Sequence, residues 1–118
     1  MEKCKLEKAR TTQQILESLV DRVSKLTSGN ISHNIASIRS VTTNLNTVMV
    51  KDLIASCEED DDLELKMLLE KLERNIWGID NILQDLTAAT VDNGKRHLAV
   101  WIKFYADALD KALLRYEV

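Results

Sequence analysis

The sequence contains no proline and only three glycines among its 118 residues. Proline breaks helices and glycine weakens them, so their scarcity favours long, uninterrupted helices. Hydrophobic residues make up 45 % of the chain, which is normal for a globular protein and argues against disorder. We therefore expect a single helical domain over residues 1–118, with one core.

Long apolar runs are also missing. No run approaches the roughly 18 to 20 residues that a helix needs to span a bilayer, so we expect no membrane span. The start, MEKCKLEKAR, is charged and lacks the apolar core of a secretory signal. Cys4 and Cys57 are far apart and belong to no CxxC pair, which favours free thiols in a reducing compartment. These features predict an intracellular protein, cytoplasmic or nuclear, or a domain excised from one.

The residues that carry chemistry are sparse. The only histidines are His33 and His97, and the residues three positions before them, Asn30 and Gly94, exclude the Glu-x-x-His pattern of a di-iron bundle. No glycine-rich phosphate loop is present, and neither cysteine has a recognisable base. We therefore expect no catalytic residue, no metal site and no cofactor, and a protein that is not an enzyme. A basic face large enough to bind nucleic acid is absent as well.

Negative charge is concentrated in residues 58–89, which hold ten acidic and three basic side chains. Five of the acids are adjacent, whereas a calcium loop alternates its ligands with other residues and needs a glycine for its turn. A solvated loop that also caps the next helix is one interpretation, with Asp61 or Asp62 as the cap. The other is a contact for a basic protein partner. The acidic run consists of Glu58, Glu59, Asp60, Asp61 and Asp62.

The most regular pattern is a heptad stripe, in which apolar residues alternate in steps of four and three. A 3.5-residue repeat keeps one face of a helix against neighbouring helices. The stripe runs through Leu65, Leu69, Leu72, Ile76, Ile79, Leu83 and Leu86.

Similar but less regular stripes predict three further helices, so the four ranges are 3–27, 32–57, 63–89 and 95–117. Three short breaks separate helices that should run antiparallel: Ser28-Gly29-Asn30, the acidic run 58–62, and residues 90–95 with the turn pair Asn93-Gly94. We predict an all-α, four-helix, up-down-up-down antiparallel bundle with coiled-coil-like heptad seams. The alternative is a helical hairpin that completes its core with a second chain.

Two local details are open from the sequence alone. Thr11 and Gln14 could form a capping box, which would leave residues 1–10 as an arm, although a helix that begins near Lys3 fits the stripe better. A short strand over 47–50 is conceivable, because that part of the second helix is poor in helix formers. The second and fourth stripes are predicted to run through Ile31, Ile35, Ile38, Val41, Leu45 and Val48, and through Leu98, Ile102, Tyr105, Leu109, Ala112 and Tyr116.

The third and fourth helices carry more apolar residues than one stripe requires. Tryptophan is common among the residues that dominate binding energy, which suggests a partner or dimer surface. The candidates for this surface are Met67, Trp77, Trp101, Phe104 and Leu113.

These features predict a non-enzymatic protein–protein interaction module, a subunit or adaptor that forms a homodimer or hetero-oligomer. The alternative is a small monomeric regulator or inhibitor of one target protein, of viral or bacterial origin. A bundle that holds a cofactor in its core is a third interpretation, and it lacks ligands.

Overall fold

The computed structural model of this protein describes residues 2–117, and the structure is 84 % helical. Its second helix is a single continuous rod, because α2, the π-helix η1 and α3 follow one another without a break. The four rods are therefore α1, α2–η1–α3, α4 and α5. The bounds are Lys3–Ser24 for α1, Ile31–Asn44 for α2, Leu45–Val50 for η1, Lys51–Glu59 for α3, Leu63–Asp85 for α4 and Val91–Leu114 for α5.

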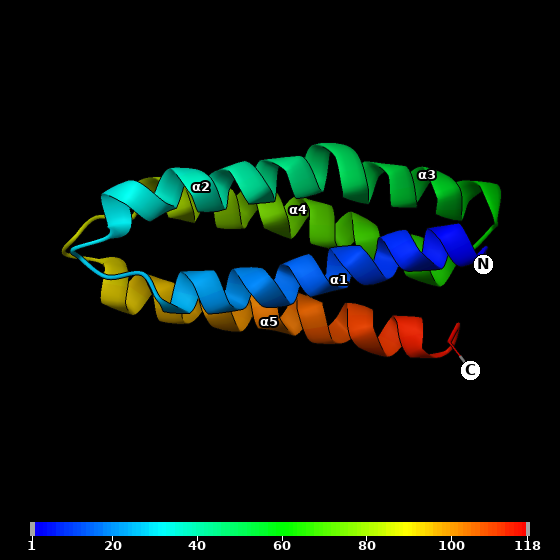
Figure 1. The fold of residues 1–118 in the computed structure, drawn as a ribbon. Helices are drawn as coiled ribbons and strands as arrows, with labels where there is room; N and C mark the ends of the chain where they lie inside the picture. Colours follow the sequence, from blue (N-terminus) through cyan, green and yellow to red (C-terminus); the bar gives the residue numbers. More distant parts are fainter. Residues whose placement is uncertain (1, 118) are drawn as a thin grey trace.

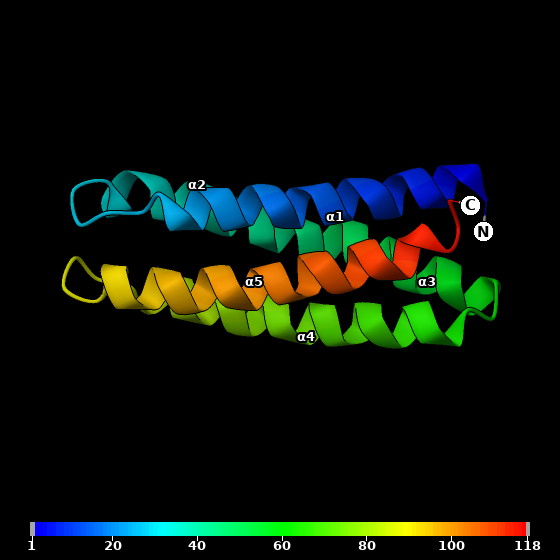
Figure 2. The same ribbon diagram turned by 90° about the horizontal axis from the view of Figure 1, so that it is seen from below.

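The rods run alternately up and down along one axis, as Figure 1 shows. The α1–α2 and α4–α5 connections lie at one end, and the α3–α4 connection lies at the other end beside both chain termini (Figures 1 and 2). The molecule measures 46 × 24 × 19 Å. This confirms the predicted all-α bundle.

The apolar stripe of α4 lies in the centre of the bundle, as its heptad spacing predicts. Leu65, Leu69, Leu72, Ile76, Ile79 and Leu83 are all buried, and Leu86 packs against them half-buried. The facing side chains come from every other rod and include Leu16, Leu45 and Leu98. One core therefore holds the four rods together.

The π-helix η1 changes which side of the second rod faces the core. A π-helical turn contains more residues than an α-helical turn, so it rotates the residues that follow it. The predicted stripe is right at Ile38 and Leu45 but wrong at Val48, which is 49 % exposed, while Val50 is buried. The strand considered for 47–50 is also wrong, because these residues belong to η1.

The stripe of α5 is rotated slightly from its predicted position. Leu98, Ile102 and Leu109 are buried as predicted, but Ala106 and Leu113 are buried in place of Tyr105, Ala112 and Tyr116, which are half-buried. The reason is that α5 packs most closely on α1, so its buried face turns toward that helix. The small side chain of Ala106 permits this close approach.

Two connections at the same end of the bundle use the same reciprocal hydrogen bonds. The backbone N–H of Thr27 donates to Asn30 Oδ1 at 2.8 Å, and the N–H of Asn30 donates to Thr27 Oγ1 at 3.2 Å. Thr87 and Thr90 repeat this arrangement, with distances of 3.0 and 3.3 Å. Each pair has the reciprocal bonding pattern of a capping box and closes the turn that leads into the next helix. The predicted break at Asn93-Gly94 is wrong, because both residues lie within the first turns of α5.

The structure also decides how α1 begins, how the chain turns after α1 and which residue caps α4. The first helix begins at Lys3, so the Thr11–Gln14 capping box and the 1–10 arm are wrong. The predicted break at Ser28-Gly29-Asn30 is present, and it does not use a left-handed glycine, since no glycine in the described chain has a positive φ. Asp62 does cap α4, because its side chain accepts from the backbone N–H of Leu65 at 3.3 Å.

The four rods are not equally close to one another. α1 packs mainly along α5, and the α2–η1–α3 rod packs mainly along α4. Polar contacts cross both close pairs: Gln13 Nε2 donates to the carbonyl oxygen of Ala106 at 3.4 Å, and Arg39 Nε donates to Asp80 Oδ1 at 3.1 Å. The two seams that join these pairs, α1–α2 and α4–α5, are therefore the looser ones.

Leu72→Ala should lower the free energy of unfolding by about 2–5 kcal/mol, because Leu72 is 1 % exposed and its truncation leaves a cavity. Met67→Ala is the matched control on the same helix, at a side chain that is 59 % exposed, and should change the stability by less than about 0.5 kcal/mol. Urea denaturation followed by circular dichroism measures both. Equal unfolding midpoints for the two variants would show that this stripe is not the core.

Candidate functional site

The candidate surface residues divide into three groups in the structure. Met67, Trp77 and Phe104 are exposed, Trp101 is half-buried, and Leu113 is completely buried. Placing Leu113 on a partner surface is therefore wrong, because the rotation of α5 toward α1 turns this residue into the core. Whether the exposed residues contact a partner stays a prediction.

Trp101 closes the middle of the α4–α5 seam. Its Nε1–H donates to Asn75 Oδ1 at 2.9 Å, and its ring lies over Gly78. A Cβ atom at Gly78 would lie 3.0 Å from the ring atom Cη2, which is closer than ordinary van der Waals contact. The absence of a side chain at Gly78 therefore makes room for the indole, and Trp101 is a bridge between the helices.

The seam is hollowed on either side of this bridge. Toward the α4–α5 connection, a hollow of about 430 Å³ lies between the two helices and is lined by Ile82, Leu86 and Gly94, among others. Toward the other end, Ala108 and Ala112 line a second hollow of about 470 Å³, with charged side chains at its rim. Both are shallow surface depressions, so the α4–α5 face is uneven and partly apolar.

The most exposed large apolar side chain is Val100, on the outer face of α5. Phe104 lies one turn farther along, and residues four apart are neighbours on a helix surface. The Phe104 ring packs edge-on against Tyr105, with the ring centroids 5.2 Å apart. Val100 is not among the surface residues predicted from the sequence, because an apolar residue within a helix does not by itself reveal whether it faces the core or solvent.

The acidic run is largely paired with basic groups of the same chain. Lys5 Nζ donates to both carboxylate oxygens of Asp60, at 3.1 and 3.0 Å, and Lys66 pairs with Glu58 at 3.2 Å. The hydrogen bond to the Asp60 carboxylate raises the pKa of Lys5. The run therefore ties α1 and α4 to the α3–α4 connection.

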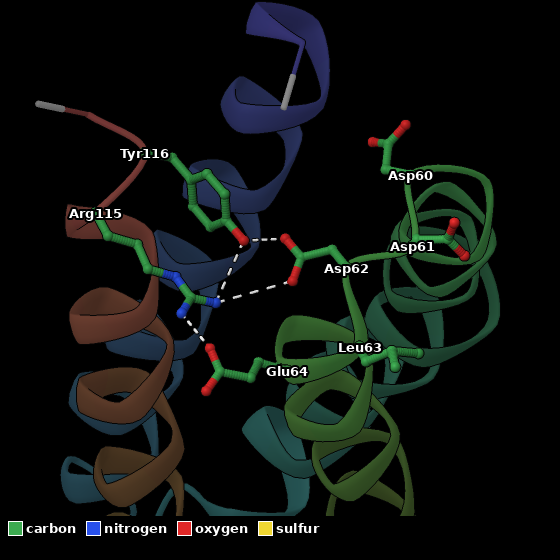
Figure 3. Close-up of a pocket in the computed structure, with 7 residues that line it drawn as sticks. All are labelled: Asp60, Asp61, Asp62, Leu63, Glu64, Arg115 and Tyr116. Atoms are coloured by element: carbon green, nitrogen blue, oxygen red, sulfur yellow. Dashed lines mark hydrogen bonds and ion pairs between the residues drawn. The ribbon is translucent and has the colours of Figure 1, made fainter.

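The end of α5 is fastened to the same connection (Figure 3). The Tyr116 hydroxyl donates to the Asp62 carboxylate, and the Arg115 guanidinium pairs with Glu64 and lies 3.8 Å from Asp62. The hydrogen bond from Arg115 lowers the pKa of Glu64. Asp61 points away from these groups in Figure 3 and has the left-handed φ of 55° that turns the chain into α4.

The two cysteines lie in different surroundings. Cys4 is exposed near the start of α1, whereas Cys57 is buried at the end of α3. Burial, and to a smaller extent the charges of Asp62 and Asp60, raise the pKa of the Cys57 thiol to about 11. At neutral pH this thiol is protonated and is a poor nucleophile.

Other kinds of site find no support within residues 2–117. No three His, Cys, Asp or Glu side chains there come together in a group that could hold a metal ion. His33 and His97 are both exposed. No described helix combines the length and apolarity that a membrane crossing requires. Compared with known proteins, the sequence matches no family model, no curated protein and no solved structure.

Asp62→Ala should lower the free energy of unfolding by about 1–2 kcal/mol, because it removes the cap of α4 and the acceptor of Tyr116. Glu59→Ala is the control within the acidic run, since Glu59 is exposed and its nearest cation, Lys5, is 3.8 Å away. Its effect should stay below about 0.5 kcal/mol. Urea titration of both variants tests the assignment, which fails if Asp62→Ala is as stable as the wild type.

Maleimide at about pH 8 should modify Cys4 quickly and Cys57 only after unfolding, because the Cys57 thiol is buried and protonated at that pH. Mass spectrometry counts the modified thiols with and without urea. Cys4→Ser is the control and should show no rapid labelling. Rapid modification of the folded Cys4→Ser chain would mean that the α3 end opens readily.

Proposed function

We propose that this chain is a non-enzymatic protein-interaction module, acting as a subunit or adaptor of a larger intracellular assembly. The observation that supports the proposal is the outward position of Val100 and Phe104. They lie one turn apart near the middle of α5, with exposed fractions of 73 % and 64 %.

The bundle does not need these two side chains for its core. The α5 residues that fill the core are on the opposite face and include Leu98, Ile102 and Leu109, all almost completely buried. Burying a large apolar side chain contributes about 1.5–3 kcal/mol, so neighbouring ones left in water offer free energy to a partner. Neighbouring exposed apolar residues beside a half-buried tryptophan are typical of binding surfaces.

A basic partner attracted by the acidic run is a second element of the proposal. Most of these carboxylates already have partners within the chain, so they add less to binding than their number in the sequence indicates. Glu59 and Asp61 are the members best placed to act outward, since Glu59 has only a distant cation and Asp61 makes no ion pair among the described residues. Long-range attraction of this kind changes the association rate more than the affinity.

A small regulator that binds one target protein as a monomer is the alternative function. The observation that favours it is the completeness of the core, which fills without a second chain. A regulator would form a stoichiometric complex with one target, whereas an assembly subunit would be recovered with several proteins.

The Phe104→Glu variant tests the proposed module, because a charge in an apolar contact costs desolvation and removes aromatic packing. The tagged chain is purified from its source cells, and the recovered proteins are quantified by mass spectrometry. We expect specific partners of the wild type to fall about tenfold or more with Phe104→Glu.

Met67→Glu is the matched control, because Met67 has a similar exposed fraction, 59 %, but lies on α4. It should leave partner recovery unchanged. Circular dichroism confirms that both variants keep their helix content. Equal recovery with the wild type and Phe104→Glu would contradict an interaction through α5.

A further inference from the structure

The outer face of α5 carries a row of seven exposed residues, called here the outer stripe, of which Val100, Phe104 and Leu114 are apolar. Its steps of 4, 3, 4, 3, 4 and 3 place these residues along one side of the helix, where a second helix could lie beside them. Every member is exposed, so nothing in the described chain covers this stripe. The residues are Asn93, His97, Val100, Phe104, Asp107, Lys111 and Leu114.

We propose that this outer stripe binds the same stripe of a second copy, with the two α5 helices antiparallel. The inference deepens the proposed function and rests on it, because it names the partner of the same α5 surface. In this register Val100 lies opposite the partner's Phe104, and His97 lies opposite the partner's Asp107. A two-fold axis repeats each contact, which gives a closed, symmetric pair.

The charges along α5 select a second copy and its direction. Arg96 lies six residues before the Val100–Phe104 centre and Asp107 lies five residues after it, so an antiparallel copy brings each Arg96 close to the partner's Asp107, next to His97. Asp92 and Lys111 are related in the same way, one turn farther out. A parallel copy would instead bring Asp107 against Asp107 and Lys111 against Lys111. Opposite charges that meet across an interface favour its register, and like charges disfavour it.

The position of α5 leaves room for such a contact. Seen from below, α5 lies in the foreground along most of the length of the bundle (Figure 2). The stripe from Asn93 to Leu114 is about 31 Å long at the rise of an α-helix. Trp101 and Ile82 lie on the α4 side of this face, where they extend its apolar surface.

The charges are paired only weakly within the chain. Lys103 contacts Asp107 at 2.9 Å, and Lys95 contacts Asp92 at 3.6 Å, but all four residues remain solvent-accessible. No ion pair occupies Arg96 or Lys111 among the described residues. A second copy would therefore give Arg96 and Lys111 carboxylate partners.

A charge reversal tests this register with the 118-residue chain. Sedimentation equilibrium at micromolar concentration should show a dimer for the wild type. Asp107→Arg should weaken self-association about tenfold or more, because it faces the partner's Arg96, and Arg96→Asp should do the same. The double variant Arg96→Asp/Asp107→Arg should recover most of the loss, since the pair is restored with its charges exchanged.

The recovery separates an interface from a local structural effect. Within one chain, Asp107→Arg still lies beside Lys103 in the double variant, so an effect confined to that helix would not be reversed. Met67→Glu is the control for surface charge in general and should leave the dimer unchanged. Helix content measured by circular dichroism should be the same in all variants.

Cross-linking tests the direction. In the Cys4→Ser background, a His97→Cys chain and an Asp107→Cys chain are mixed and oxidised. The antiparallel register places these positions opposite each other, within the Cα separation of about 7 Å that a disulfide spans. Mixed disulfides should therefore predominate, whereas disulfides between identical variants would overturn the antiparallel register.

A wild-type chain that is monomeric throughout the micromolar range would overturn the dimer. So would a dimer that neither Asp107→Arg nor Val100→Glu weakens, because it would be formed by another surface. These failures differ from failure of the proposed function. A monomer that still loses its cellular partners with Phe104→Glu uses α5 for a different protein.

Discussion

The burial of the α4 stripe is the interaction on which the rest of this structure depends. Its leucines and isoleucines repeat every three or four residues, and all those from Leu65 to Leu83 are removed from water. Each buried side chain of this size contributes a few kcal/mol, so the stripe is a major part of the stabilisation that offsets chain entropy. The other rods can bury this stripe only by surrounding α4 and turning their own apolar faces toward it.

The bundle meets this requirement with two close pairs rather than four equal contacts. Small buried residues, Ala9 and Thr12 on α1 and Ala106 on α5, let those helices approach closely. In the second close pair, polar contacts such as Arg39–Asp80 join α2 to α4. The α4–α5 seam is left wider, and the indole of Trp101 over Gly78 fills its middle. This unequal packing turns the outer side of α5 toward solvent and places Val100 and Phe104 where a partner can reach them.

The acidic end has a different part in the molecule. Its carboxylates accept from Lys5, Lys66 and Tyr116, so they connect three rods and the chain ends at a site where the apolar core stops. Exposed ion pairs contribute little to stability individually, but several pairs around one connection restrict its geometry. A surface whose charges are paired internally is less free to attract a partner. The apolar face of α5 is therefore the better basis for the proposed interaction.

The sequence by itself determined the helical class, the four rods, their antiparallel order and the stripe of α4. These follow from local properties: the periodicity of apolar residues, the scarcity of helix breakers and the shortness of the connections.

Only the tertiary structure decided which face of each helix is inward. The π-helical turn at η1 exposes Val48. The close approach of α1 and α5 buries Leu113 and leaves Tyr105 half-buried. A helix has many residues at the edge of its stripe, and a small rotation moves them into or out of the core. That rotation depends on side chains from other rods, which is why the sequence could assign a candidate surface to the third and fourth helices but could not define it residue by residue.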